Sequence, residues 1–102
     1  MSNSVILVGR LFEKKILKED EKGIKNIEII MNINRNYKND DGVYESDLIN
    51  VKLIGGVAES TFDYCNNGDV IGLKGRIENK NGKLEIIGEK VTFLSSRKKE
   101  EN

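Results

Sequence analysis

Residues able to bind a ligand are concentrated in the segment Asp47–Gly56, which reads DLINVKLIGG. Its odd-numbered positions are apolar between the first aspartate and the glycines, whereas its even-numbered positions are Leu48, Asn50, Lys52 and Ile54. Because successive side chains of a strand point to opposite faces, one face of this segment is expected to lie in a core. The other face carries a cation and an amide between two aliphatic side chains, so we expect it to meet a ligand or another chain.

The residue types that most enzymes require are scarce in this chain. It contains no histidine, one cysteine (Cys65) and no glycine-rich phosphate loop. Asp40 and Asp41 are neighbouring acids in a turn-like segment without further ligands, which is typical of turn chemistry rather than of a metal site. We therefore predict a binding protein that is not an enzyme and that needs no cofactor and no metal.

The composition favours one small domain with a single core. The 102 residues are 37% hydrophobic and 33% charged, and the 17 basic residues balance the 17 acidic ones. Net charge therefore gives no argument for a polyanionic ligand, and the local placement of lysine and arginine must supply any attraction. No apolar run approaches the ~20 residues of a membrane helix, and the N-terminus has no export signal. We expect no membrane association and a cytoplasmic location, with which the single cysteine agrees.

Apolar alternation and turn residues predict five strands and one short helix. The predicted strands are residues 4–12, 24–34, 47–56, 70–77 and 84–94, and the helix follows residue 56. This all-β order, with the helix between the third and fourth strands, is the plan of the OB-fold, a five-stranded Greek-key barrel. Gly9, Gly55 and Gly75 fall where such a barrel bends. Periodicity alone also allows an SH3-like barrel or a small sandwich.

The same patterns predict which side chains face inward. Val5–Val8 is apolar on both faces, so we expect both to be covered, one of them by another subunit. Ala58, Phe62 and Cys65 share one face of the helix, which is expected to stop at Asn67–Gly68.

Two connections are also predicted from turn residues. Asn81–Gly82 is a tight hairpin signal that pairs Ile77 with Ile86, whereas residues 34–46 form a longer polar loop around Asp41–Gly42. In the strand between the helix and the tight hairpin, alternation places three aliphatic side chains inward (Ile71, Leu73 and Ile77) and two cations outward (Lys74 and Arg76).

Four segments of this chain resemble bacterial single-stranded DNA-binding proteins. They are residues 3–11 (NSVILVGRL), 29–37 (IIMNINRNY), 44–59 (YESDLINVKLIGG followed by VAE) and 64–77 (YCNNGDVIGLKGRI). The resemblance covers roughly residues 3–94 and implies an OB-fold domain over residues 1–94. The remaining residues, 95–102, are polar, and we expect them to form a disordered tail. The resemblance also implies a homotetramer, with a dimer as the other possibility, and sequence-independent binding of single-stranded DNA in replication, repair or recombination.

The resemblance further implies where DNA would bind. Aromatic positions of the family correspond here to Tyr37, Leu48 and Ile54, of which only Tyr37 is aromatic. Two other departures are the short hairpin at Asn81–Gly82 and the C-terminal sequence RKKEEN in place of an acidic, apolar tip. Adding the outward cations and amides gives the predicted DNA contacts: Arg10, Asn34, Arg35, Tyr37, Lys38, Leu48, Asn50, Lys52, Ile54, Lys74 and Arg76.

Other interpretations of these residues remain. Outward cations are commonly just solvated, Arg10 can pair with an acid at a subunit contact, and Leu48 and Ile54 can be subunit-interface residues. The second function compatible with the chain is an OB-fold protein-interaction module, such as a primosome-type accessory subunit, with weak DNA affinity. Neutral net charge and the two missing aromatic side chains favour this second function.

Overall fold

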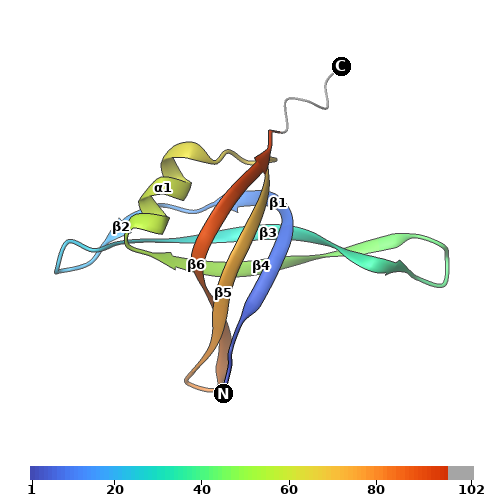
Figure 1. The fold of residues 1–102 in the computed structure, drawn as a ribbon, viewed down its shortest axis with the longest axis horizontal. Helices are drawn as coiled ribbons and strands as arrows, with labels where there is room; N and C mark the ends of the chain where they lie inside the picture. Colours follow the sequence, from blue (N-terminus) through green and yellow to red (C-terminus); the bar gives the residue numbers. More distant parts are fainter. Residues whose placement is uncertain (97–102) are drawn as a thin grey trace.

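The computed structural model describes residues 1–96, which form a closed β-barrel with one helix (Figure 1). The elements in chain order are β1 (Val5–Lys14), β2 (Lys18–Glu19), β3 (Lys25–Lys38), β4 (Tyr44–Ile54), α1 (Gly56–Tyr64), β5 (Val70–Lys80) and β6 (Lys83–Ser95). The sheet order is β1-β5-β6-β4-β3-β2, and β1 also pairs with β3, which closes the barrel. This is the predicted OB-fold, with the two-residue β2 added in the connection between the first two long strands.

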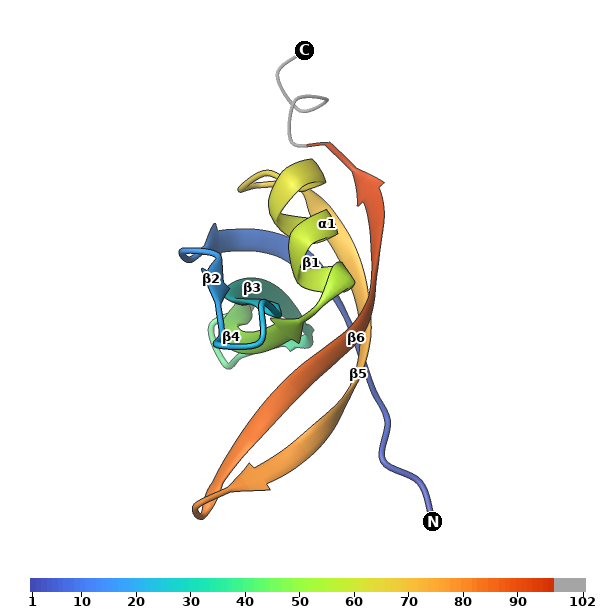
Figure 2. The ribbon, with the colours of Figure 1, turned by 90° about the vertical axis from the view of Figure 1, so that its left-hand side faces the viewer.

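Alternation along the strands produces the core, as the sequence predicted. On β4, Val51 and Leu53 are buried, and they pair across the β3–β4 ladder with the buried Ile29 and Ile27. Leu11 of β1 completes the same layer. Helix α1 lies over one end of the barrel (Figure 2) and contributes the buried Ala58. No helix within residues 1–96 is long and apolar enough to cross a membrane.

One face of β1 has no cover within this chain. Leu7 is half-buried against the core, whereas Ile6 and Val8 on the opposite face are exposed. The prediction that a second subunit covers this face therefore stays a prediction. The predicted tail lies outside the described residues from residue 97 onward, and Ser95 is the last residue of β6.

The connection between β3 and β4 is shorter than predicted. The expected loop at residues 34–46 is mostly strand, because β3 continues to Lys38 and β4 starts at Tyr44. A tight turn suffices because the Asn39 side chain organises it: Asn39 Oδ1 accepts hydrogen bonds from the backbone N–H groups of Asp41 and Val43 at 2.9 and 3.0 Å. The hairpin consequently extends well beyond the barrel (Figure 1).

Helix α1 differs from the prediction in its end and its buried face. It ends at Tyr64 because Cys65 is already extended, and Gly68 belongs instead to the turn that follows. Phe62, predicted to lie on the buried face, is exposed, whereas Thr61 is buried. The Phe62 ring lies under Lys14, whose Nζ is 5.0 Å from the ring centroid.

The β5–β6 hairpin confirms the predicted turn and register. Asn81 and Gly82 both have positive φ, as a two-residue hairpin turn requires, and Ile77 pairs with Ile86. Ile77 was predicted to be a core residue but is 37% exposed. The reason is that Ile77 lies at the edge of the barrel: its partner Ile86 is the first residue of β6 that pairs with β4, and β1 pairs with β5 only as far as Gly75. The hairpin beyond this point projects downward in Figure 1.

Barrel curvature depends on glycine where backbones approach closely. A Cβ atom at Gly75 would overlap the carbonyl oxygen of Ile87 on β6, at an irregularity of the β5–β6 ladder. A Cβ at Gly9 would lie 2.5 Å from the carbonyl oxygen of Asn32 on β3, next to the point where β1 begins to pair with β3. Both positions were predicted as bends from glycine alone.

We expect Gly75→Ala to destabilise the fold by about 2–3 kcal/mol, because the added methyl group meets backbone that cannot rotate away. Gly56→Ala is the matched control: it adds the same methyl group into open space in the first turn of α1, where alanine is the better helix former, and stability should stay equal or rise. Urea unfolding of both variants at one protein concentration measures the difference. Equal midpoints for the two variants would contradict this account of the barrel.

Candidate nucleic-acid interface

A groove of about 580 Å³ lies between the β1–β3 connection and the β5–β6 hairpin. Figure 2 shows these two segments on the same side of the barrel, with β3 and β4 between them. The lining contains more cations than anions: Lys15, Lys18, Lys52 and Lys83 against Glu28 and Glu85. A concave surface with an excess of positive charge raises the local concentration of an anionic ligand.

Three of the four lysines have their charge available to a ligand. Lys15 is paired with Glu28, with 3.0 Å between its Nζ and the Glu28 Oε1. Lys18, Lys52 and Lys83 make no ion pair within the described part of the chain. Lys52 is also the cross-strand neighbour of Glu28, so charges of both signs lie on the floor of the groove. One rim carries Lys15 and Lys18, and the other carries Lys83 together with Glu85.

The groove opens onto the outer face of β1, β3 and β4, where six predicted contacts lie together. Along β4, Ile54, Lys52, Asn50 and Leu48 follow one another on this face, as alternation predicted. The ladders extend the row sideways, since Leu48 pairs with Asn32 and Asn32 pairs with Arg10. The predicted contacts that share this face are Arg10, Asn34, Leu48, Asn50, Lys52 and Ile54.

Arg10 also helps to form a smaller pocket at the edge of this face. Its Nη1 donates a 2.8 Å hydrogen bond to the carbonyl oxygen of Gly68, and a pocket of about 230 Å³ is lined by Arg10, Phe12 and Asn32 among others. The Asn32 Oδ1 atom is buried without a hydrogen-bond partner in the structure. Arg10 is therefore held in place by the fold, with its guanidinium beside a recess.

At the tip of the β3–β4 hairpin the predicted residues divide between two faces. Lys38 pairs with Tyr44 across the ladder, and its Nζ lies 5.6 Å from the Tyr44 ring centroid, while Tyr37 is exposed beside it. Arg35 lies on the face opposite Asn34, because it alternates with it along β3 and reaches Asp47, which pairs with Ile33. Arg35, although a predicted contact, therefore lies on the opposite face of the sheet from Leu48, Asn50 and Lys52.

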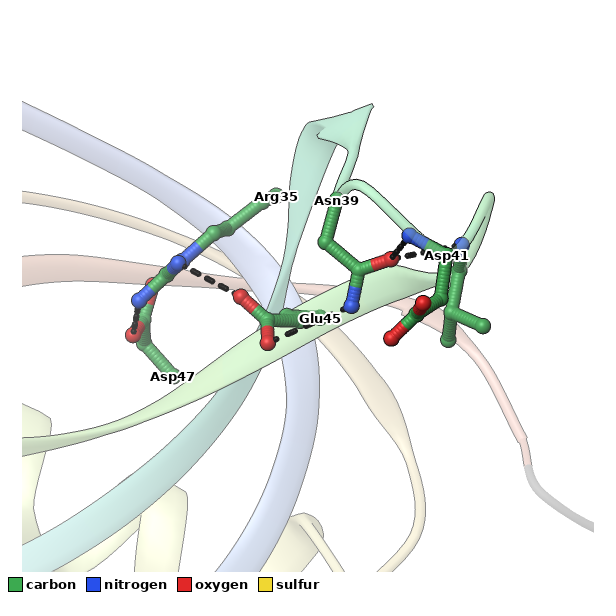
Figure 3. A network of polar contacts seen from close by, with 6 residues as sticks. Arg35, Asn39, Asp41, Glu45 and Asp47 are labelled. Atoms are coloured by element: carbon green, nitrogen blue, oxygen red, sulfur yellow. Dashed lines mark hydrogen bonds and ion pairs between the residues drawn. The ribbon is translucent and has the colours of Figure 1, made fainter.

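Arg35 is also neutralised by two acids (Figure 3). Its Nε and Nη2 donate to the two carboxylate oxygens of Asp47 at 3.1 and 2.9 Å, and its Nη1 donates to Glu45 at 2.9 Å. These hydrogen bonds lower the pKa of Asp47 and raise the pKa of Arg35. A bidentate pair of this kind fixes the hairpin's shape and satisfies the donors that a phosphate would need.

Lys74 and Arg76 lie on the outer surface of β5, around the barrel from the groove. Arg76 donates to Glu78 and Glu89, each at 2.8 Å, and these hydrogen bonds, with that to Glu89 as the larger cause, raise its pKa. Arg76 and Lys52 pair with the same residue, Ile87, across the two ladders of β6, although Arg76 does not line the groove. Lys74 pairs with Ile6 on one side and with Lys90 on the other.

Sequence reasoning missed the rims of the groove. The predicted DNA contacts include none of the rim lysines, Lys15, Lys18 and Lys83. They become neighbours of Lys52 only through the barrel, which brings the β1–β3 connection and the β5–β6 hairpin to the same side. The OB-fold topology points to them, because the connection between the first two barrel strands and the hairpin between the last two border the usual binding surface of this fold.

The described residues offer no second kind of site. Residues 1–96 contain no group of three or more histidine, cysteine or acidic side chains placed to hold a metal ion. The thiol of Cys65 is buried, and burial raises its pKa, which lowers its reactivity as a nucleophile. The lysine-lined groove and the adjoining outer face are accordingly the candidate functional surface.

Comparison with known proteins shows the family of this chain. The pattern of the single-strand binding protein family matches residues 2–95. Single-stranded DNA-binding protein B of Bacillus subtilis (strain 168) is 33% identical over 109 residues, which cover 98% of this chain and 96% of that protein.

Two solved structures have a similar fold. The protein PriB from Ralstonia solanacearum matches with a TM-score of 0.74 at 16% identity, over 91% of this chain and 98% of that one. A deletion mutant of the single-stranded DNA binding protein from Thermus aquaticus matches with a TM-score of 0.74 at 21% identity, over 94% of this chain and 52% of that one. At these identities the two structures show similarity of fold only. The family pattern and the Bacillus relative show that the chain belongs to the single-strand binding protein family.

Proposed function

We propose that this chain binds single-stranded DNA without sequence preference and protects it during replication, recombination or repair. The observation that carries the proposal is the lysine-lined groove at the face of β3 and β4, in a chain that belongs to the single-strand binding protein family.

In the proposed binding mode, one kind of side chain contacts the phosphates of the DNA and another kind contacts its bases. Lys18, Lys52 and Lys83 attract phosphates, while Leu48 and Ile54 cover base faces on the adjoining surface. An aromatic platform contributes about 1–3 kcal/mol per stacked base. Leu48 and Ile54 contribute through apolar burial instead, and Tyr37 at the hairpin tip is the aromatic residue placed to stack.

The arginines play a smaller part in this proposal than the lysines. Arg35 and Arg76 each already bind two carboxylates, so a phosphate has to displace an acid before it gains either guanidinium. Lys52 has no such competitor beyond its cross-strand neighbour Glu28. We infer that affinity is moderate and that most of the electrostatic attraction comes from the groove lysines.

We further propose that the protein works as a homo-oligomer in the cytoplasm. The exposed Ile6 and Val8 on β1 support an assembly through this strand, as a tetramer or a dimer. Lys74, which is directly opposite Ile6, would then lie at the border between the assembly surface and the DNA-binding surface. The protein is proposed to act by binding alone, since its relatives are named as DNA-binding proteins rather than as enzymes.

A second candidate is the OB-fold protein-interaction module with weak DNA affinity. The pairing of both outer arginines with acids favours it, and so do the exposed Leu48 and Ile54, which a protein partner would cover. This function predicts an assembled protein whose affinity for DNA is weak even at low salt, so the same binding measurement separates the two functions.

Binding of labelled poly-dT by the wild-type protein tests the proposed function directly. We expect affinity to fall as salt rises, with a log–log slope of about −0.7 for each phosphate contacted. A fluorescent label on the DNA is needed because the chain contains no tryptophan. Absence of binding at low salt would reject the proposal.

Removing the central groove lysine should weaken binding and its dependence on salt together. Lys52→Ala is expected to make the slope less steep by about 0.7, because one phosphate contact is lost. Lys22→Ala is the control: it removes the same charge from the exposed turn before β3, outside the groove. Equal changes in slope for both variants would mean that the attraction is diffuse and does not reside in the groove.

Freeing Arg76 from one of its acids should strengthen binding. A partly exposed ion pair contributes up to about 1 kcal/mol, so we expect Glu89→Gln to raise DNA affinity by about twofold to fivefold. The same substitution in an Arg76→Gln background should have little effect, because the gain depends on the released guanidinium. An equal gain in both backgrounds would show that the carboxylate acts by general repulsion and that Arg76 makes no contact.

A further inference from the structure

We propose that Asn3 is a positioning residue for the lysine-lined groove: its side chain clamps the β5–β6 hairpin at the angle that places Lys83 on the rim. The inference rests on the proposed function, because it concerns how the same groove is held in shape. It gives a role in binding to the segment before β1, which contributes no side chain to the groove itself.

The Asn3 side chain binds both backbone groups of one hairpin residue. Asn3 Oδ1 accepts a hydrogen bond from the backbone N–H of Ile77 at 2.9 Å, and Asn3 Nδ2 donates to the carbonyl oxygen of Ile77. An asparagine amide has both an acceptor and a donor, so it can replace a peptide group in this exchange. In Figure 1 the N-terminal segment accordingly runs beside the base of the hairpin, below the barrel.

These two hydrogen bonds continue the β1–β5 ladder beyond the end of β1. The outermost pair of that ladder is Val5 with Gly75. Asn3 and Ile77 lie two residues beyond this pair on their respective segments, where an antiparallel ladder would place its next equivalent pair. The Asn3 side chain thus supplies the hydrogen bonds that the main chain of a longer β1 would make.

Little else within residues 1–96 ties the outer part of the hairpin to the barrel. On the opposite edge of the hairpin, the pairing of β6 with β4 begins only at Ile86. At the base of the hairpin Gly75 pairs with Gly88, so no contact between cross-strand side chains braces the ribbon there. The ion pairs of Arg76 join it only to residues of β5 and β6 themselves.

Side-chain packing does not fix the angle of the hairpin either. A recess of about 380 Å³ lies between β4 and the hairpin, with Leu48 on one side and Ile77 and Leu84 on the other. Leu84 is 73% exposed, so it gives the hairpin little packing against the barrel. Figure 2 shows the hairpin extending well past β4. Hydrogen bonds at the edge of β5 are therefore the main restraint on its outer part.

The angle of the hairpin matters because the hairpin carries one rim of the groove. Lys83 is the first residue of β6, and it lines the groove together with Lys15 and Lys18 of the β1–β3 connection. A hairpin released by loss of the clamp has to be ordered when DNA binds, and ordering a mobile segment on binding lowers affinity. Asn3 therefore strengthens binding without touching the DNA.

Asn3→Ala tests the clamp in a protein that keeps every groove lysine. We expect its affinity for labelled oligo-dT to be lower by about twofold to fivefold, since two hydrogen bonds no longer hold the hairpin before binding. The dependence of affinity on salt should also become less steep, as the contact of Lys83 with a phosphate weakens. Ser2→Ala is the matched control, because Ser2 is exposed in the same segment and its side chain makes no hydrogen bond within residues 1–96.

A double-mutant cycle separates positioning from a general loss of stability. In a Lys83→Ala background, Asn3→Ala should have little further effect on affinity or on the salt slope, because the side chain that the clamp positions is gone. A merely structural role of Asn3 would lower affinity by the same factor in both backgrounds. That result would overturn the proposal.

Backbone NMR of the free protein tests the clamp without DNA. Asn3→Ala should speed hydrogen exchange at the amide of Ile77 and increase the fast motion of residues 78–84, while exchange at the core residues Ile29 and Val51 stays unchanged. Unchanged motion of residues 78–84 in the variant would contradict the clamp.

The outcomes distinguish the clamp from the function on which it rests. If the wild-type protein binds labelled oligo-dT, and Asn3→Ala binds it as tightly as Ser2→Ala does, the clamp is wrong and the proposed function stands. If the wild-type protein fails to bind labelled oligo-dT at low salt, the proposed function fails, and the role of Asn3 in binding fails with it.

Discussion

The whole arrangement depends on β1 pairing with two strands at once, β5 along its first half and β3 along its second half. This double pairing closes the barrel and removes its sheet edges. It requires a tight bend in β1, and Gly9 supplies it where the carbonyl of Asn32 approaches too closely for any side chain. Closure in turn fixes which faces of β3 and β4 point outward, so the position of Lys52, Asn50 and Leu48 depends on the backbone contact between β1 and β3, the strand that pairs with β4.

Because the strands differ in length, the barrel leaves two hairpins projecting from it. The β3–β4 hairpin is held in shape by Arg35 between Asp47 and Glu45 (Figure 3), and the β5–β6 hairpin turns tightly at Asn81–Gly82. Both carry side chains beyond the core that folding alone does not require. The groove lies beside the β5–β6 hairpin. Its charged side chains come from the β1–β3 connection, from β3 and β4, and from this hairpin. The candidate surface therefore combines two sources: the barrel strands supply Lys52, Asn50 and Leu48, and the β1–β3 connection and the β5–β6 hairpin supply the rim lysines.

Alternation and turn chemistry sufficed to predict the parts of the fold that are local. The Val51 and Leu53 face of β4 and the pairing of Ile77 with Ile86 were predicted correctly because period-two patterns and an Asn-Gly turn act over a few residues. Predictions failed where tertiary geometry decides. Ile77 follows the inward pattern but lies at the edge of the barrel, and Phe62 lies on the exposed side of α1, where its ring contacts Lys14. The role of Lys83 depends on a segment more than sixty residues earlier in the chain, to which no local pattern refers. Six predicted contacts share one face because they follow adjacent strands, whereas nothing in the sequence around Arg35 indicated its two acids.

The central claim is that a single strand of DNA lies along the outer face of β3 and β4, between the β1–β3 connection and the β5–β6 hairpin. Amide NMR shifts recorded during titration with unlabelled oligo-dT test it most directly, because they map contact on every strand at once. The account predicts that the largest shifts fall on residues 48–54, on residues 15–18 and on the hairpin from Ile77 to Ile86, with α1 unaffected. Shifts confined to α1, or scattered evenly around the barrel, would contradict it.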